Sequence, residues 1–282
     1  MSGRIDVLFG DIATALHSVP GARALYAFGS IPNGTYDEFS DLDLTLVTED
    51  FDSSLAQRHQ CLGRLRPVLL DWCIEVTESS WAGTILLSGT SPYQKVDIGI
   101  VKIERELDWS CRPDCLKIWN QPSGSGLIPD GGTPSRPAYE PAVGSVEHFL
   151  VGHMLGVTRY LKARKRGRTF TSWRFAQALA EAVLATVYTS SIGVPLLARK
   201  LTTSEYADLD RHLPGDRAAM YFEHLCHADE YRMDESVRFF VSQLLSHLAS
   251  AQDTSTGLDI VVKTLESFVT IELGSLRRKI SG

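Results

Sequence analysis

The most informative part of the sequence is Phe28-Gly29-Ser30, followed by a loop of nine residues and then by Ser40-Asp41-Leu42-Asp43-Leu44-Thr45-Leu46-Val47. The alternation along residues 41–47 predicts a half-buried β-strand, in which successive side chains point to opposite faces of a sheet. Asp41 and Asp43 then share one face, and the leucines between them take the other. Two neighbouring carboxylates are the ligands that a hard divalent cation bound to a triphosphate requires.

The turn before this strand has a chemistry of its own. Gly29 lets the backbone approach a ligand without a Cβ in the way, and successive amide N–H groups in such a turn form an anion-binding concavity. Ser30 adds a hydroxyl that can donate a hydrogen bond to a phosphate oxygen. The turn and the acid pair together predict a site for phosphate and metal.

A third acid is expected from a later strand. The run from Tyr93 to Val101 alternates and is rich in β-branched residues, with Asp97 between Val96 and Ile98. A single Asp in a strand is most often a solvated residue on a polar face. Three in this order behind a Gly-Ser turn favour a metal site instead, whereas Asp37 and Glu38 in the intervening loop are read as solvated turn residues.

The three motifs resemble those of the DNA polymerase β-like nucleotidyltransferases, and among these the antibiotic nucleotidyltransferases that modify aminoglycosides and lincosamides. The resemblance covers about the first hundred residues, and the second half is similar to the helical half of the lincosamide-type enzymes in its length and its basic segment. It implies an α+β protein, with an N-terminal nucleotidyltransferase domain of mixed sheet and helices followed by an all-α C-terminal domain.

The resemblance also implies an enzyme of the nucleotidyltransferase class, one that contributes to antibiotic resistance. Such an enzyme moves a nucleoside monophosphate, with ATP as the expected donor, to a hydroxyl of a small molecule and releases pyrophosphate. Asp41 and Asp43 would hold two Mg²⁺ ions, and Asp97 would be the third ligand or the general base. Gly29 and Ser30 would hold the β- and γ-phosphates. Glu147 and Glu181 in the helical half remain alternatives for the base.

A basic cluster marks the end of a predicted helix in the second half. Five cations lie within seven residues, namely Lys162, Arg164, Lys165, Arg166 and Arg168. Cations stabilise a helix C-terminus, and long basic side chains lie easily in water. One or two could equally reach the triphosphate through charge-assisted hydrogen bonds, and Lys162 and Arg166 are the candidates we name for that role.

Composition shifts divide the chain into a catalytic domain at 1–120, a linker or ordered loop rich in Pro, Gly and Ser at 121–141, and a helical domain at 142–282. Hydrophobic spacing and capping residues predict the individual elements. Helices are expected at 4–19, 53–70, 145–165, 171–191, after the capping box Thr202-x-x-Glu205, after a cap at Asp234, and at 258–280, and strands at 25–28, 41–47, 73–76, 84–87 and 96–101.

Composition narrows the class of partner. The chain has 282 residues, 44% of them hydrophobic, and a net charge of −6, which argues against broad nucleic-acid binding and suits a cationic small molecule. No apolar stretch reaches the ~18 residues of a membrane span. Five cysteines, at 61, 73, 111, 115 and 226, lack a disulfide-scaffold spacing and are expected to be reduced thiols of a cytoplasmic protein.

Two rival functions stay open at this point. One is a nucleotidyltransferase of the same fold that acts on RNA or on a protein, and the other is a noncatalytic, antitoxin-like binding module. The sequence leaves open which NTP is preferred, which hydroxyl is modified, and whether a homodimer builds one site from two chains.

Overall fold

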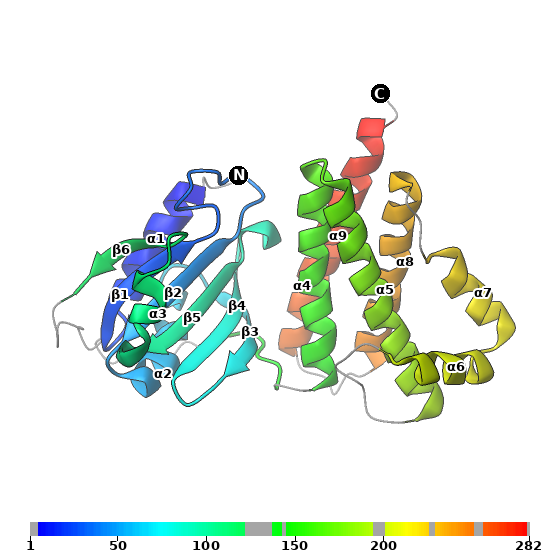
Figure 1. The fold of residues 1–282 in the computed structure, drawn as a ribbon, viewed down its shortest axis with the longest axis horizontal. Helices are drawn as coiled ribbons and strands as arrows, with labels where there is room; N and C mark the ends of the chain where they lie inside the picture. The colour runs from blue at the N-terminus through cyan, green and yellow to red at the C-terminus, as the bar shows by residue number, and fades with distance from the viewer. Residues whose placement is uncertain are drawn as a thin grey trace. The chain divides into compact units, whose positions relative to one another are not determined.

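The computed structural model describes residues 5–121, 137–142, 145–193, 201–225, 229–250 and 256–280 (Figure 1). The chain divides into two compact units, one made of Met1–Val143 with Thr256–Val261 and the other of Gly144–Ser255 with Val262–Gly282. The first unit carries the β-sheet and the second is helical in its described residues. The α+β class, a mixed sheet with helices followed by a helical region, is confirmed.

A six-stranded sheet in the order β3-β4-β5-β2-β1-β6 forms the centre of the described part of the first unit. Its strands are β1 (Ala22–Phe28), β2 (Leu42–Thr48), β3 (Val68–Val76), β4 (Ser80–Leu87), β5 (Val96–Lys102) and β6 (Leu116–Asn120). The pair β2 and β5 is parallel, whereas the other neighbours are antiparallel. The two strands that carry the predicted acids are therefore direct neighbours.

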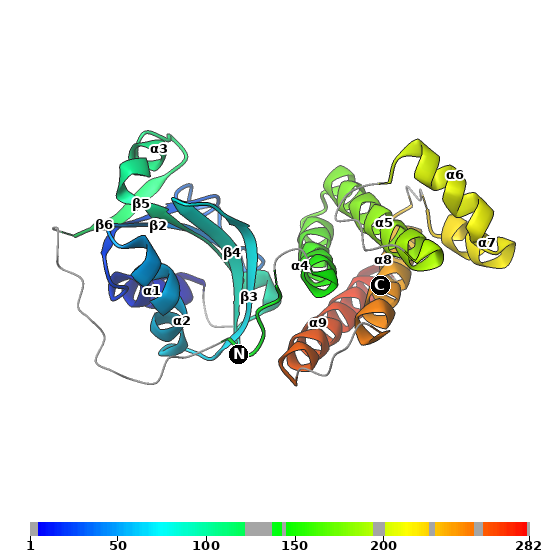
Figure 2. The ribbon, with the colours of Figure 1, turned by 90° about the horizontal axis from the view of Figure 1, so that it is seen from below.

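Two helices, α1 (Ile5–His17) and α2 (Phe51–Gly63), cover one face of this sheet (Figure 2). The leucines of β2 point into that layer and are completely buried, as the alternation predicted. They pack in one apolar cluster with Ile12 and Leu16 of α1 and Leu62 of α2. Because neighbouring residues of a strand alternate, the acids of β2 and β5 are left on the opposite face of the sheet.

The described part of the first unit also contains two short 3₁₀ turns and a short helix: η1 (Pro92–Gln94), η2 (Ile103–Arg105) and α3 (Leu107–Ser110). The predicted helix at 53–70 is wrong in its second half, since α2 ends at Gly63 and the chain enters β3 at Val68. Pro67 explains the error, because it cannot donate to a helical hydrogen bond and its ring clashes with the preceding turn. Strand β6 was not predicted at all, and the indole of Trp119 fixes it to α1 by donating to the carbonyl of Ala13 (3.2 Å).

The described helices of the second part are α4 (Val146–Lys165), α5 (Thr169–Ile192), α6 (Thr203–His212), α7 (Gly215–Glu223), α8 (Glu230–Ser250) and α9 (Thr256–Ile280). The capping box of Thr202 and Glu205 is confirmed at the start of α6. Asp234 is not a cap, because α8 begins at Glu230 and Asp234 is buried inside it, paired with Arg164. Within the described ranges, no helix is both long enough and apolar enough to cross a membrane.

Most of the proposed linker at 121–141 lies outside the described residues. Cys226 lies outside them as well. The described segment 137–142 runs along the edge of β3, where the amide of Ala138 donates to the carbonyl of Val68 (2.8 Å) and the amide of Asp71 donates to the carbonyl of Tyr139 (3.1 Å).

Candidate active site

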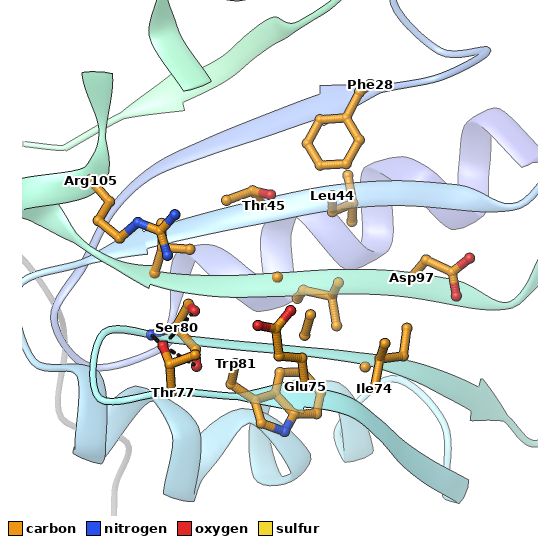
Figure 3. A pocket seen from close by; sticks show the side chains of 15 residues that line it. Phe28, Leu44, Thr45, Ile74, Glu75, Thr77, Ser80, Trp81, Asp97 and Arg105 are labelled. Carbon is orange, nitrogen blue, oxygen red and sulfur yellow. Dashed lines mark hydrogen bonds between the residues drawn. The ribbon is translucent and has the colours of Figure 1, made fainter. Parts of the chain in front are cut away.

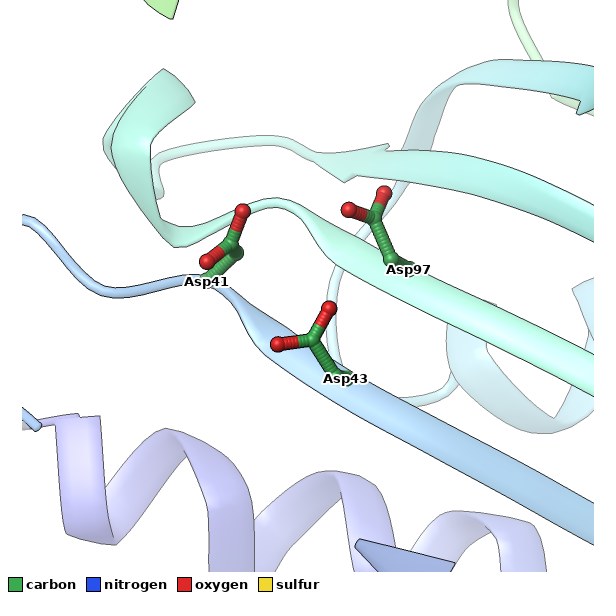
Figure 4. Close-up of side chains that lie close together, drawn as sticks. All are labelled: Asp41, Asp43 and Asp97. Carbon is green, nitrogen blue, oxygen red and sulfur yellow. The ribbon is translucent and has the colours of Figure 1, made fainter. Parts of the chain in front are cut away.

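The three predicted acids converge on the sheet face opposite α1 and α2 (Figure 4). Asp43 and Asp97 are cross-strand partners in the parallel pair β2 and β5, and Asp41 precedes β2 by one residue. One carboxylate oxygen from each lies within 4.8 Å of the others, and all three residues are half-buried. Such a set of hard oxygen donors, gathered on rigid strands, is suited to a divalent cation.

The Gly29-Ser30 turn lies directly beside Asp43. Gly29 has a φ of 72°, and a Cβ at this position would lie 2.5 Å from Oδ2 of Asp43. Only glycine fits here, for both reasons. Within the turn the side-chain amide of Asn33 donates to the carbonyl of Gly29 (2.9 Å), and the amide of Thr35 donates to the carbonyl of Ser30 (3.1 Å).

The loop that leads to Asp41 is fixed by Asp37. Its Oδ1 accepts hydrogen bonds from the amide of Phe39 (3.0 Å) and from the hydroxyl of Ser40 (3.0 Å), and Ser40 is buried. Such Asx-type bonds are typical of turns. Asp37 therefore shapes the loop that delivers Asp41, in line with its reading as a turn residue.

Lys95 is a member of the site that the motif reading missed. Its Nζ lies 3.0 Å from Oδ2 of Asp41 and forms an ion pair with Oδ2 of Asp97, and its side chain is only 2% exposed. Asp97 also accepts a hydrogen bond from the hydroxyl of Thr84 on β4 (2.5 Å). The sequence spacing of these two residues indicates that they are close. Lys95 and Asp97 are two residues apart on an extended segment, and therefore their side chains share a face.

The donor set fits a hard divalent cation such as Mg²⁺. Three carboxylates and one ammonium ion leave the cluster with two net negative charges when all four groups are ionised. Mg²⁺ binds through one or two carboxylates together with substrate phosphates, and the Gly29-Ser30 turn lies next to Asp43. Lys95 supplies a positive charge to the same carboxylates and therefore competes with a cation for them.

The basic cluster of the second unit is partly occupied by internal contacts. Arg164 is buried and pairs with Asp234 (2.9 Å) and Glu230 (2.6 Å), and Lys165 pairs with Glu272 (2.9 Å). These two cations connect α4 to α8 and α9, which supports the structural reading for them.

The other named candidates of the second unit lie on α4 and α5. Lys162 is buried in the last turn of α4, and Arg166 caps that helix, its amide donating to the carbonyl of Lys162 (3.1 Å). Glu147 lies in the first turn of α4 and Glu181 within α5, both half-buried. The roles of these four residues stay predictions.

Comparison with known proteins gives matches in solved structures alone, since no family model and no curated protein sequence matches this chain. An aminoglycoside 6-adenyltransferase from Bacillus subtilis is similar at 14% identity with a TM-score of 0.29, over 92% of this chain and 97% of that one. A STING-associated CdnE c-di-GMP synthase from Capnocytophaga granulosa is similar at 13% identity with a TM-score of 0.24, over 97% of this chain and 81% of that one.

A nucleotidyltransferase-like protein from Exiguobacterium sibiricum is similar at 11% identity with a TM-score of 0.25, over 97% of this chain and 92% of that one. At TM-scores this low the backbones superpose only loosely, so the candidate site is defined by the residues of this chain.

Proposed function

We propose that this chain is a metal-dependent nucleotidyltransferase that moves AMP from ATP to a hydroxyl of a small molecule and releases pyrophosphate. One observation carries the proposal: three carboxylates, two on the adjacent strands β2 and β5 and one just before β2, converge within 4.8 Å beside the Gly29-Ser30 turn. The acceptor that we favour is an aminoglycoside- or lincosamide-like antibiotic, which would make the protein a resistance factor. The net negative charge of the chain suits such a cationic acceptor.

Different residues would bind the donor nucleotide and activate the acceptor hydroxyl. The backbone of Gly29 and the hydroxyl of Ser30 would hold the β- and γ-phosphates of the donor. Asp41, Asp43 and Asp97 would hold one or two Mg²⁺ ions, which would neutralise charge on the triphosphate and lower the pKa of the attacking hydroxyl when bound.

The transfer itself forms one bond and breaks one bond. The acceptor oxygen bonds to the α-phosphorus, the bond from that phosphorus to the bridging oxygen breaks, and pyrophosphate leaves. The proton of the acceptor hydroxyl passes to a carboxylate, for which Asp97 of β5 is our first candidate. Glu147 and Glu181 remain alternatives.

A transfer assay tests this function. The protein is incubated with Mg²⁺, each α-labelled NTP, and a panel of aminoglycosides and lincosamides, and labelled acceptor is separated from labelled nucleotide. We expect adenylylated antibiotic from the wild type and at least a thousandfold loss in folded Asp41→Asn and Asp43→Asn variants. Glu38→Gln is the matched control, because Glu38 is an exposed acid of the same loop. Full activity in both Asp variants would refute the metal assignment.

The same experiment separates the rival functions. If the label appears in nucleotide oligomers or cyclic products formed from NTP alone, the acceptor is a nucleotide and not a small molecule. If it appears in RNA or in a protein, that macromolecule is the acceptor. Calorimetric titration with Mg-ATP tests the alternative of a noncatalytic binding module, because such a module need not bind the nucleotide.

A further inference from the structure

Lys95 lies inside the acid cluster, with only 2% of its side chain exposed. Its Nζ lies 3.0 Å from Oδ2 of Asp41 and forms an ion pair with Oδ2 of Asp97. A buried ammonium ion is costly unless carboxylates compensate its charge. Lys95 therefore occupies one oxygen on each of two carboxylates that we assign to the metal.

The strand register brings Lys95 to this place. Leu42 pairs with Val96 in the parallel ladder of β2 and β5, and the amide of Leu42 donates to the carbonyl of Lys95 (3.0 Å). The preceding residues, Asp41 and Lys95, are therefore neighbours across the two strands. Asp97 is two residues farther along β5 and shares the face of Lys95, so the ammonium ion lies between the two carboxylates.

An aromatic pair ties together the two segments that lead to Asp41 and to Lys95. The ring of Phe39 meets the ring of Tyr93 edge-on, with 5.2 Å between the centroids, and Tyr93 is buried. Phe39 stands two residues before Asp41, and Tyr93 stands two residues before Lys95. This contact holds the backbones of the two segments together. Lys95 can therefore leave Asp41 by rotation of its own flexible side chain, without a movement of either segment.

Asp97 is fixed on its other oxygen by Thr84 of β4. The two residues pair across β4 and β5, and the hydroxyl of Thr84 donates to Oδ1 of Asp97 (2.5 Å). Thr84 is buried, and a hydrogen bond to a charged group in such a place is a strong one. Asp97 thus has a protein donor on each oxygen, whereas Asp41 lies at the end of a loop, just before β2. Of its two carboxylate partners, Asp41 is therefore the one that Lys95 can release.

A groove of about 350 Å³ begins at Asp97 (Figure 3). It extends over small residues of three neighbouring strands, Thr45, Ala82 and Gly99. Gly99 is two residues after Asp97 on β5 and Lys95 is two residues before it, so the groove and Lys95 lie on opposite sides of that carboxylate. The groove is therefore separate from the contact between Lys95 and Asp41.

We propose that Lys95 exchanges the carboxylate of Asp41 for the triphosphate of the donor nucleotide. This inference rests on the proposed function and adds to it the order in which metal and nucleotide bind. Without nucleotide, the ammonium ion stays between Asp41 and Asp97 and repels a divalent cation from them. The triphosphate offers the ammonium ion other oxygens, so Asp41 becomes open to the cation that arrives with the nucleotide. Metal and nucleotide then bind together, and the metal alone binds weakly.

Binding of Mn²⁺, a paramagnetic substitute for Mg²⁺, tests this exchange without turnover. Binding of Mn²⁺ alone is measured by the loss of the EPR signal of the free ion. The complex of Mn²⁺ with α,β-methylene-ATP, in which the bond to be broken is blocked, is titrated by calorimetry. For the wild type we expect the Mn–nucleotide complex to bind at least about tenfold more tightly than Mn²⁺ alone.

Lys95→Met should change the two affinities in opposite directions. Mn²⁺ alone should bind about tenfold more tightly than to the wild type, because the repelling charge is gone, and the Mn–nucleotide complex about tenfold more weakly, because the triphosphate loses its cation. A damaged fold would weaken both, and a Lys95 that only repels cations would tighten both when removed. Lys102→Met, at the far end of β5, is the control and should leave both affinities within about twofold.

Thr84→Val and Thr84→Ser form a second pair that leaves Lys95 in place. Thr84 is a positioning residue, since it acts through Asp97. Thr84→Val should weaken binding of the Mn–nucleotide complex about tenfold, whereas Thr84→Ser keeps the hydroxyl and should remain within about twofold of the wild type. Equal affinities in the two Thr84 variants would contradict this role.

The outcomes separate the exchange from the proposed function. Both affinities weakened or both tightened in Lys95→Met, or a wild type that binds Mn²⁺ alone as tightly as the Mn–nucleotide complex, would overturn the exchange. If Lys95→Met does not fold, Lys95→Gln carries the same two expectations. A wild type that binds as expected but transfers AMP to no acceptor would overturn the proposed function and leave the exchange standing.

Discussion

Lys95 places its Nζ 3.0 Å from Oδ2 of Asp41 while the same ammonium ion contacts Asp97, and so one buried cation joins two of the three acids. Three carboxylates at this distance repel one another, and Lys95 offsets part of that repulsion within the fold. The same pairing opposes the binding of a second cation. Lys95 therefore sets how much the stability of the first unit depends on metal.

Lys95→Met is expected to lower the free energy of unfolding by about 2 kcal/mol in the absence of divalent ions, because the carboxylates then lose their counter-charge. Added Mg²⁺ should restore most of this loss, so it should stabilise the variant more than the wild type. Urea unfolding in EDTA and in about 5 mM Mg²⁺ measures both the loss of stability and its recovery. This concentration is enough for a site that binds the ion through few carboxylates. Lys102→Met, at the far end of β5, the strand that follows Lys95, is the control, and equal stabilisation by Mg²⁺ in all three proteins would contradict the role of Lys95.

Gly29→Ala and Gly34→Ala form a matched pair. Both glycines have positive φ, 72° and 61°, so each substitution should cost about 1 kcal/mol of stability from backbone strain alone. A Cβ at Gly34 meets nothing within 4 Å, whereas one at Gly29 meets Oδ2 of Asp43. Calorimetry with Mg-ATP should therefore show at least a tenfold loss of affinity in Gly29→Ala and a change within twofold in Gly34→Ala. Equal affinities in the two variants would exclude a special contact at Gly29.

A buried ion-pair network holds α2 to β3 on the helix-covered face of the sheet. Asp71 is completely buried, and its Oδ2 accepts from Nε of Arg58 (2.9 Å) and also contacts Nε2 of His59. The guanidinium of Arg58 stacks over the ring of Trp81 (4.5 Å to the centroid) and reaches Glu140 (3.4 Å). This network lies apart from the acid cluster and serves the fold.

Asp71→Asn should lower the free energy of unfolding by about 3 kcal/mol, because it leaves the buried Arg58 without its main counter-charge. The double variant Arg58→Met with Asp71→Leu should recover part of that loss, since it removes both charges. Asp52→Asn, an exposed acid of α2, should change stability by less than about 0.5 kcal/mol. Chemical denaturation measures all three, and a fully stable Asp71→Asn protein would contradict a stabilising network.

Burial gives the helical unit a pH-dependent stability. It lowers the pKa of His153 from 6.5 to about 4, and the imidazole packs edge-on against Phe149 (4.4 Å between ring centroids). The neutral form is thus favoured in the folded state, so this contribution is present above pH 6.5 and is lost as the pH falls from 6.5 toward 4. Between pH 7 and pH 5 the wild type should lose about 2 kcal/mol more stability than His153→Leu. Urea titrations at the two pH values test this, and identical losses would show that folding does not lower the pKa of His153.

The active-site strands were predictable because their signals are local. Alternation placed the β2 leucines and the acids on opposite faces, and the run around Asp97 predicted β5 within one residue of its bounds. The helix expected at 53–70 went wrong where Pro67 interrupts an otherwise helical apolar spacing. Strand β6 was not predicted because, among the described strands, Leu116–Asn120 pairs with β1 alone, and β1 is distant from it in sequence.

The sequence by itself determined that Asp41 and Asp43 share one face of a strand, that Gly29 and Ser30 form a turn before it, and that a helical half follows. Alternation, turn chemistry and helical periodicity are properties of short segments, and no partner from afar is needed to read them. Only the tertiary structure shows which segments become neighbours. Strand β2 pairs in parallel with β5, so Asp43 faces Asp97, and Lys95 reaches Asp41. Small residues beside these acids open a groove. Strand order and register are set by packing of segments distant in sequence, and therefore no local pattern specifies them.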